Sequence, residues 1–248
     1  MTRRPTAIRL YVDAPLQAGV RLDLDARQAN YLANVMRLKP GDRLGVFNGR
    51  DGDWLAEVAA ARRRAASLAV VAPSADQQRL PDLWLCIAPI RKARIDWVVE
   101  KATELGVARI QLVATTRTVV DRVNLDRLKA HAIEAAEQCG GNALPEIAPP
   151  APLDRTLADW PAGRRLLFCD EDRADPPVAT ALADAAPGPW AVLIGPEGGF
   201  EGRERALIRS RPFVVPASLG PRVLRAETAA LAAVALWQAA LGDWGRDT

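Results

Sequence analysis

Two glycine-bearing loops are the feature of this sequence best suited to chemistry. They occupy residues 193–200 (LIGPEGGF) and 217–224 (ASLGPRVL), each between a short apolar run and a helical segment. Glycine allows a backbone to approach a ligand closely and to present its N–H and C=O groups. Two such loops, roughly twenty residues apart, favour one shared pocket at the edge of a sheet. The alternative is a pair of ordinary strand-to-helix turns in an α/β domain.

Charged and polar side chains follow the second loop at the start of a helical segment. Arg225, Glu227 and Thr228 crowd there, whereas the only histidine is His131. A single histidine argues against a histidine-based triad and against a multi-histidine metal centre. Acid–base chemistry would therefore fall to carboxylates, to arginines or to the substrate. The alternatives are a surface arginine at Arg225 and, at Glu227, an ordinary acidic residue that interacts with the helix dipole.

The cysteines also argue against metal chemistry. Cys86, Cys139 and Cys169 are widely spaced, odd in number and absent from any C-x-x-C pair, which disfavours a disulfide framework and a zinc site. Cys86 and Cys169 lie in apolar, strand-like runs. We interpret them as buried small hydrophobic residues rather than as catalytic thiols, and we predict no metal.

The elements that must position these loops alternate between strand-like and helical patterns. We expect strands at 83–88, 109–114, 164–169, 190–194 and 213–215, and helices at 94–104, 124–138, 177–185, 201–209 and 225–241. This alternation is typical of an α/β domain with a mostly parallel sheet. Ligands bind such sheets at the carboxyl ends of the strands, where both glycine loops begin. The proline-rich residues 144–161 are expected to be irregular.

The first 72 residues have a different character. Short strand-like runs separated by close turns favour a small β-barrel, and residues 1–72 carry twelve Arg and Lys against seven Asp and Glu, a net +5, whereas residues 73–248 carry −2. A basic module on a near-neutral body is typical of a domain that binds a polyanion. The alternative is a general bias of the chain toward Ala and Arg. We predict a barrel at 1–72, a linker at 73–81 and an α/β domain at 82–248.

The sequence has no pattern of a membrane or secreted protein. No apolar stretch reaches the length of a transmembrane helix without a charge or an amide, and no apolar region follows the basic start of the chain. We therefore expect a cytoplasmic protein without a membrane partner.

Blocks along nearly the whole chain resemble the RsmE family of 16S rRNA (uridine-N3) methyltransferases, in the SPOUT class. The blocks are IRLYV at 8–12, VMRLKPGD at 35–42, KATELGV at 101–107, AAEQC at 135–139 and the two glycine loops. The resemblance implies a PUA-like or OB-like barrel, a SPOUT domain with a trefoil knot, and a homodimer. It also implies S-adenosylmethionine as cofactor and 16S rRNA of the small ribosomal subunit as partner.

The resemblance also implies roles for individual residues. The cofactor is expected to contact Leu167, Asp170, Ile194, Gly195, Pro196, Glu197, Gly198, Gly199, Ala217, Ser218, Leu219, Gly220, Val223 and Leu224. RNA is expected to contact Arg9, Arg37, Lys39, Arg91, Lys92 and Arg117. For the uridine-N3 chemistry itself, Arg225 and Glu227 are the nearest candidates by sequence: Arg225 would stabilise the uridine anion and Glu227 would accept the N3 proton.

Two positions depart from the family pattern. Asn30 stands where a histidine is usual, and no arginine follows closely after Cys139. The second departure leaves a non-catalytic RNA-binding or ribosome-assembly module as an alternative. A nicotinamide-dependent oxidoreductase is the other alternative, although the first strand of the α/β region leads into Pro89-Ile90-Arg91 and not into a G-x-G-x-x-G fingerprint.

Overall fold

The computed structural model of the chain describes residues 8–62, 65–120, 122–172 and 174–245, and it divides into two compact units. The first unit comprises Met1–Arg79 with Ala136–Leu144, and the second comprises Leu80–Ala135 with Pro145–Thr248. The segment Ala136–Leu144 was expected within the α/β domain, so the first unit takes in residues from far along the sequence. The domain boundaries at 72 and 82 stay a prediction.

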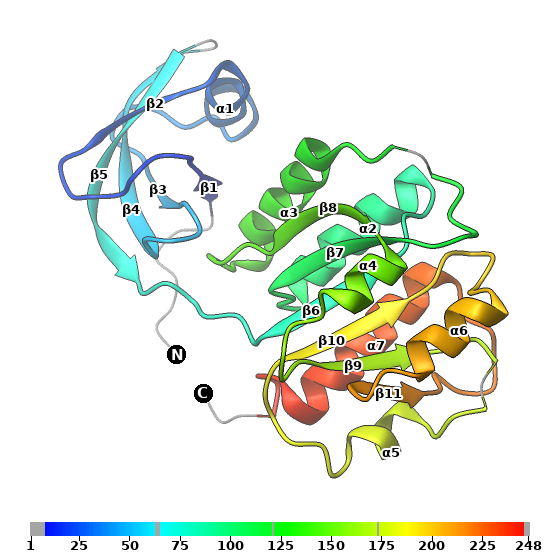
Figure 1. Cartoon of the computed structure of the whole chain (residues 1–248). Coiled ribbons are helices and arrows are strands. Elements are labelled where there is room, and N and C mark those ends of the chain that lie inside the picture. The colour runs from blue at the N-terminus through cyan, green and yellow to red at the C-terminus, as the bar shows by residue number, and fades with distance from the viewer. Residues whose placement is uncertain (1–7, 63–64, 121, 173, 246–248) are drawn as a thin grey trace. The chain divides into compact units, whose positions relative to one another are not determined.

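The first unit is built on a five-stranded sheet in the order β1-β3-β4-β5-β2 (Figure 1). The strands are β1 (Arg9–Tyr11), β2 (Arg21–Leu24), β3 (Arg43–Phe47), β4 (Asp53–Arg62) and β5 (Ala65–Ala75). Asp25 begins helix α1 (Ala26–Asn30) with a capping box that it shares with Gln28, and a π-helical turn continues to Val35. β5 extends three residues into the segment expected as the linker.

A buried polar network ties the segment Ala136–Leu144 to the rest of the first unit. Arg9 pairs with Asp53 and donates to the carbonyl oxygens of Ala136 and Gly141. Asn142, fully buried, donates to the second carboxylate oxygen of Asp53 at 3.1 Å. Each buried polar group thus has a partner, which offsets its loss of hydration.

The second unit contains a six-stranded sheet in the order β11-β9-β10-β6-β7-β8, in which every neighbouring pair is parallel. Its strands are β6 (Leu83–Ile87), β7 (Arg109–Ala114), β8 (Glu146–Pro152), β9 (Arg165–Cys169), β10 (Trp190–Ile194) and β11 (Val214–Ala217). The expected parallel α/β fold is therefore confirmed. The knot that the family resemblance implies stays a prediction.

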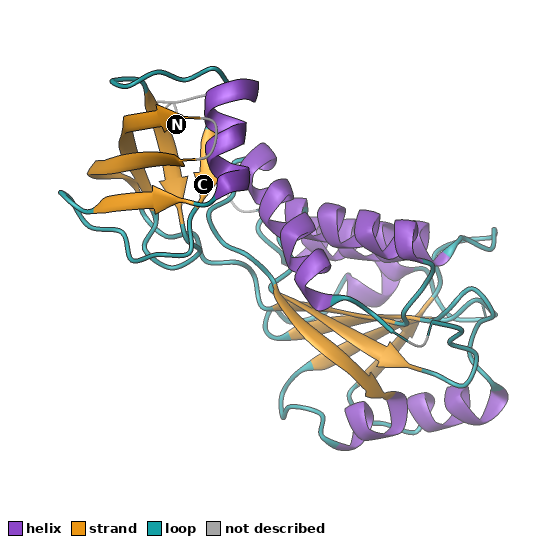
Figure 2. Ribbon diagram, turned by 90° about the horizontal axis from the view of Figure 1, so that it is seen from above, coloured by secondary structure: helices purple, strands orange, loops and turns teal. Residues whose placement is uncertain are grey.

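Helices cover both faces of this sheet (Figure 2). One face packs against α2 (Lys92–Glu104), α3 (Leu125–Cys139), α5 (Val178–Leu182) and α7 (Ala226–Leu241), and the other against α4 (Leu153–Ala158) and α6 (Gly202–Arg209). Successive side chains of a strand point to opposite faces of the sheet, so Leu85 and Ile87 join the first core and Cys86 joins the second. Because helices cover both faces, the strands are buried on both sides. Among the described residues no helix is both long and apolar enough to cross a bilayer.

The expectation that residues 144–161 are irregular is wrong. They form strand β8 and helix α4. β8 lies at the edge of the sheet. Proline has no N–H to donate, but on the outer side of an edge strand no further strand needs that hydrogen bond. Pro152 then precedes the first helical residue, Leu153, a position that requires no intrahelical N–H bond. The proline content misled the prediction because the sequence does not show that this strand lies at the edge of the sheet.

Candidate active site

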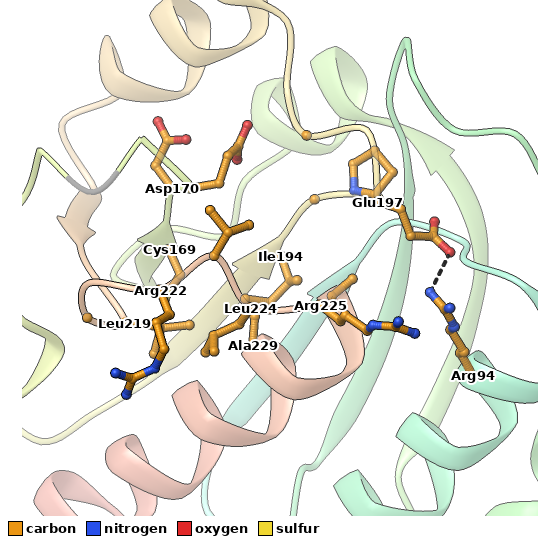
Figure 3. A pocket seen from close by; sticks show the side chains of 17 residues that line it. Arg94, Cys169, Asp170, Ile194, Glu197, Leu219, Arg222, Leu224, Arg225 and Ala229 are labelled. Atoms are coloured by element: carbon orange, nitrogen blue, oxygen red, sulfur yellow. Dashed lines mark hydrogen bonds and ion pairs between the residues drawn. The ribbon is translucent and has the colours of Figure 1, made fainter.

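The two glycine loops enclose one cavity of about 350 Å³ at the carboxyl ends of three neighbouring strands (Figure 3). β9, β10 and β11 lead into it, and the first turn of α7 closes one side. It is lined by Arg94, Cys169, Asp170, Glu171, Ile194, Gly195, Pro196, Glu197, Gly199, Leu219, Gly220, Arg222, Val223, Leu224, Arg225, Ala226 and Ala229. The shared pocket that the spacing of the loops predicted is therefore present.

The first loop requires glycine at its start because a buried ring lies against it. A Cβ at Gly195 would come within 2.7 Å of the Phe200 ring, closer than any side chain tolerates. Phe200 is fully buried and packs edge-to-face on Phe168, with ring centroids 5.3 Å apart. The ring is thus held in place, and the backbone at Gly195 can stay open toward the cavity.

The second loop is anchored at its start and apolar toward the cavity. The N–H of Ser218 donates to the Pro176 carbonyl at 2.8 Å, and the Val178 N–H donates to the Ser218 carbonyl at 3.0 Å. Gly220 then adopts a φ of +103°, which side-chain-bearing residues rarely reach. On either side of it in the chain, Leu219 and Leu224 point into the cavity (Figure 3). The loop thus combines a fixed backbone with an apolar wall.

Charged side chains gather at one end of the cavity. Arg94 Nη1 lies 3.4 Å from Glu197 Oε1, and Arg94 Nε lies 3.5 Å from Glu227 Oε1. Arg225, the residue before α7, extends toward Arg94 and Glu197, whereas Arg222 extends the other way (Figure 3). Two guanidinium groups and the carboxylate of Glu197 therefore occupy the same end of the cavity. The predicted base Glu227 pairs with Arg94 but does not itself line the cavity.

The opposite wall carries a second, more buried charge network. The carboxylate of Asp170 has no exposed surface and accepts from Arg205 at 3.0 Å and from Arg209 at 3.1 Å. Arg205 also pairs with Glu171, whose carboxylate lies against Gly199 of the first loop. Helix α6 therefore holds the acidic wall of the cavity through its two arginines.

The cavity has no activated thiol. Burial raises the pKa of Cys169, which lines the cavity, to about 12, and burial raises that of Cys86 to about 12 as well. Both thiols are thus protonated at neutral pH and unsuited to nucleophilic catalysis. Their interpretation as buried small residues is confirmed, and within the described ranges no three His, Cys, Asp or Glu side chains are grouped to hold a metal.

Most of the expected cofactor residues line this cavity. Those that do are Asp170, Ile194, Gly195, Pro196, Glu197, Gly199, Leu219, Gly220, Val223 and Leu224, and those that do not are Leu167, Gly198, Ala217 and Ser218. Leu167 and Ala217 are fully buried in the core, and their contact with the cofactor stays a prediction. Gly198 instead accepts a hydrogen bond from Arg117 at 2.8 Å through its carbonyl.

Sequence reasoning missed part of the lining. Cys169 and Glu171 flank an expected residue, and Ala226 and Ala229 are small residues of the first α7 turn facing the cavity. Adjacency and helical periodicity would have found these four. No local signal marks Arg94, because its partners Glu197 and Glu227 lie more than a hundred residues away in sequence.

The expected RNA contacts fall into two groups. Arg37, Lys39, Arg91, Lys92 and Arg117 are exposed. Arg9 is not: its side chain is 7% exposed and its guanidinium is engaged by Asp53 and two backbone carbonyls. The prediction for Arg9 is corrected accordingly, because a buried and paired guanidinium is unavailable to a phosphate. Arg9 holds the first unit together.

The departures from the family pattern also have a place in the structure. Asn30 is exposed and bonds Asn34 within its helix. The run Gly140-Gly141-Asn142 belongs to the first unit, where Asn142 bonds Gln78 and Asp53. No residue of that run lines the cavity in the second unit.

Comparison with known proteins assigns the chain to a family. The family described as the RNA methyltransferase domain matches residues 77–238, and the RNA methyltransferase PUA domain matches residues 24–71. A ribosomal RNA small subunit methyltransferase E from Synechocystis is 30% identical over 92% of this chain and 76% of that protein. The chain belongs to the methyltransferase E family.

Further members agree over nearly the full length. The family member of Rickettsia conorii is 28% identical over 92% of this chain and 93% of its own. A crystal structure of the Neisseria gonorrhoeae member, bound to S-adenosyl methionine, has a TM-score of 0.84, with 28% identity over 96% of this chain and 99% of that one. Family membership confirms the resemblance and decides against the nicotinamide-dependent oxidoreductase.

Proposed function

We propose that this chain transfers the methyl group of S-adenosylmethionine to N3 of a uridine in 16S rRNA of the small ribosomal subunit. The observation that carries the proposal is the cavity between the two glycine loops, in a chain that aligns over 96% of its length with a family member holding this cofactor. Cytoplasmic location and an rRNA substrate follow from this activity.

The lining of the cavity fits the cofactor. Ile194, Leu219 and Leu224 offer apolar surface to an adenine ring, and the glycine loops offer main-chain N–H and C=O groups to its polar edge. Glu171 supplies a carboxylate for hydroxyl or ammonium groups, whereas both carboxylate oxygens of Asp170 are already engaged by Arg205 and Arg209. When bound, S-adenosylmethionine supplies an electrophilic methyl carbon on a sulfonium that leaves as a neutral thioether.

The charged end of the cavity fits the chemistry of a uracil. N3 carries a proton that must leave before its electron pair can bond the methyl carbon. Glu227 accepts that proton, and Arg225 stabilises the negative charge that spreads onto the uracil oxygens. The cavity must also align N3 with the methyl carbon, because the displacement is in-line and its rate depends on that alignment.

The test of the function is a modification map. The chain is incubated with labelled S-adenosylmethionine and either 16S rRNA or small subunits, and the methylated nucleotide is then located. We expect one N3-methyluridine in 16S rRNA, together with calorimetric binding of S-adenosylmethionine and none of NAD. Affinity for small subunits without any methyl transfer would instead establish the non-catalytic assembly module.

RNA binding by the first unit leads to a testable expectation. Arg37 and Lys39 are exposed, and Arg37 holds a φ of +55°, a conformation that is costly for a residue with a side chain and is often found at functional positions. Arg37→Ala and Lys39→Ala should each weaken RNA binding and lower the slope of log K against log salt by about 1. Cofactor affinity should stay at the parent value.

The matched control for these variants is Arg21→Ala. Arg21 belongs to the same unit and is exposed, but it pairs with Asp23 at 3.5 Å. Filter binding over a range of salt concentrations measures all three variants. An equal loss of affinity in Arg21→Ala would mean that net charge alone, rather than a defined contact, binds the RNA.

A groove on the second unit supports a homodimer. Residues of α2 and its C-cap (Trp97, Lys101, Glu104 and Leu105) and of α7 (Thr228, Leu231, Ala232 and Ala235) line a depression of about 450 Å³. Trp97 is 42% exposed there. An exposed apolar surface of this kind favours association, and two-fold dimers are the commonest soluble assembly.

We expect light scattering at micromolar concentration to give twice the chain mass. Trp97→Glu should shift the protein toward monomer, because it would bury a charge at the interface. Trp244→Glu is the control, since Trp244 is 54% exposed and lies outside the groove. A monomeric parent, or equal effects of the two substitutions, would exclude this groove as the dimer surface.

A further inference from the structure

Arg94 joins three elements that meet at the charged end of the cavity. It lies in the first turn of α2, pairs with Glu197 of the first glycine loop at 3.4 Å and pairs with Glu227 of α7 at 3.5 Å. Its side chain is 29% exposed. Figure 3 shows its guanidinium directed at the Glu197 carboxylate, on the side of the cavity toward which Arg225 also extends.

The two oxygens of Glu227 differ in their surroundings. Oε1 faces Arg94, whereas Oε2 is buried and has no hydrogen-bond partner. The Glu227 side chain as a whole is 14% exposed. Glu227 lies next to the lining residues Arg225 and Ala226 without lining the cavity itself. An unmet buried acceptor is costly, and a substrate donor that reaches the first turn of α7 would satisfy it. Rotation about the terminal torsion of a glutamate is soft, so a small turn of the carboxylate is enough to present that oxygen.

We propose that Arg94 is a positioning residue, which holds Glu227 through one carboxylate oxygen and leaves the other for the N3 proton of the target uridine. The proposal rests on the proposed function. N3–H breaks, the proton bonds to Glu227, and the electron pair stays on N3, where it forms the new bond to carbon. Arg94 itself exchanges no proton.

The charges around Glu227 support this division of roles. Arg94 and Arg225 are the cations at this end of the cavity, and Glu197 is the second carboxylate. Arg94 is shared between two carboxylates, so its positive charge is divided between Glu197 and Glu227. Arg225 has no such pairing to Glu227 and remains available to the uracil oxygens.

The test is a double-mutant cycle on single-turnover methyl transfer. Arg94→Gln should slow the reaction about tenfold to a hundredfold, with S-adenosylmethionine affinity near the parent value, and Arg94→Lys should restore part of the rate because it returns the charge. The double variant Arg94→Gln/Glu227→Gln should be no slower than Glu227→Gln alone. Arg155→Gln is the control, since Arg155 is a 77% exposed arginine paired with Asp159 on α4.

A second cycle measures the pair without any activity. Thermal unfolding of the same variants should give a Tm change in the double variant that differs from the sum of the single changes. The proposal would be overturned if the effects of the two substitutions were additive both on the rate and on the Tm. It would also be overturned if a fall in cofactor affinity accounted for the whole loss of rate in Arg94→Gln. If the parent chain methylates no rRNA, the proposed function fails, and the unfolding cycle alone still decides whether Arg94 holds Glu227.

Discussion

Arg225→Ala and Glu227→Gln are each expected to slow methyl transfer about a hundredfold or more, while S-adenosylmethionine binds nearly as tightly as before. Arg225 directly follows the second glycine loop and lines the cavity, and Glu227 is the second residue of α7, next to the lining residue Ala226 and paired with Arg94. Neither supplies the apolar surface on which an adenine would rest. Their loss should therefore lower the rate of methyl transfer, in which charge develops on the uracil, and leave the affinity for the cofactor nearly unchanged.

Single-turnover assays with saturating cofactor separate these two effects, and calorimetry measures the cofactor affinity directly. If loss of the N3 proton limits the parent reaction, its rate should rise with pH. Arg225→Ala should depend more steeply on pH, because the anion loses its cationic partner. Arg155→Ala, a change on the α4 surface, is the control.

The outcomes of this experiment are distinct. If both variants react at the parent rate, Arg225 and Glu227 are structural and the active site lies elsewhere. If both lose the cofactor in proportion to the rate, they belong to the binding pocket. Glu197, which also lines the cavity and faces Arg94, would then be the next residue to test as the base.

Local pattern was sufficient to predict the framework of the site. The strands β6, β7, β9 and β10 are short runs buried on both faces, and runs of that kind alternating with helices indicate a parallel sheet. The two loops were recognisable because glycine is required where a backbone turns sharply against a ligand or a packed ring. Most of the residues that line the cavity belong to these two loops and could therefore be predicted.

The errors share a physical cause, which is that a partner distant in sequence decides the role of a residue. Arg9 has the appearance of a surface cation, but Asp53 and the carbonyl of Gly141 bury it. Arg94 carries no local signal, yet Glu197 and Glu227 bring it into the site. Residues 146–152 contain three prolines and still pair with β7, because no strand lies beyond them.

Gly195→Ala is expected to lower S-adenosylmethionine affinity about a hundredfold or more. The added Cβ would lie 2.7 Å from a Phe200 carbon. Phe200 is fully buried against Phe168 and therefore cannot move aside without disturbing the core of α4 and α6. The loop must move instead, and the cavity changes shape with it. Overpacking of this kind costs about 1–3 kcal/mol of folding free energy.

The control substitution lies only seven residues further along the chain. Gly202 is the first residue of α6, and a Cβ there would meet nothing within 4 Å. Gly202→Ala should keep the parent affinity and raise the melting temperature slightly, since alanine is favoured over glycine in a helix by roughly 0.5–1 kcal/mol. Calorimetry at a temperature well below the melting point of both variants excludes loss of affinity through unfolding. Parent-like affinity in Gly195→Ala would show that the Phe200 ring yields, and the close approach of the first loop would then have no part in holding the cofactor.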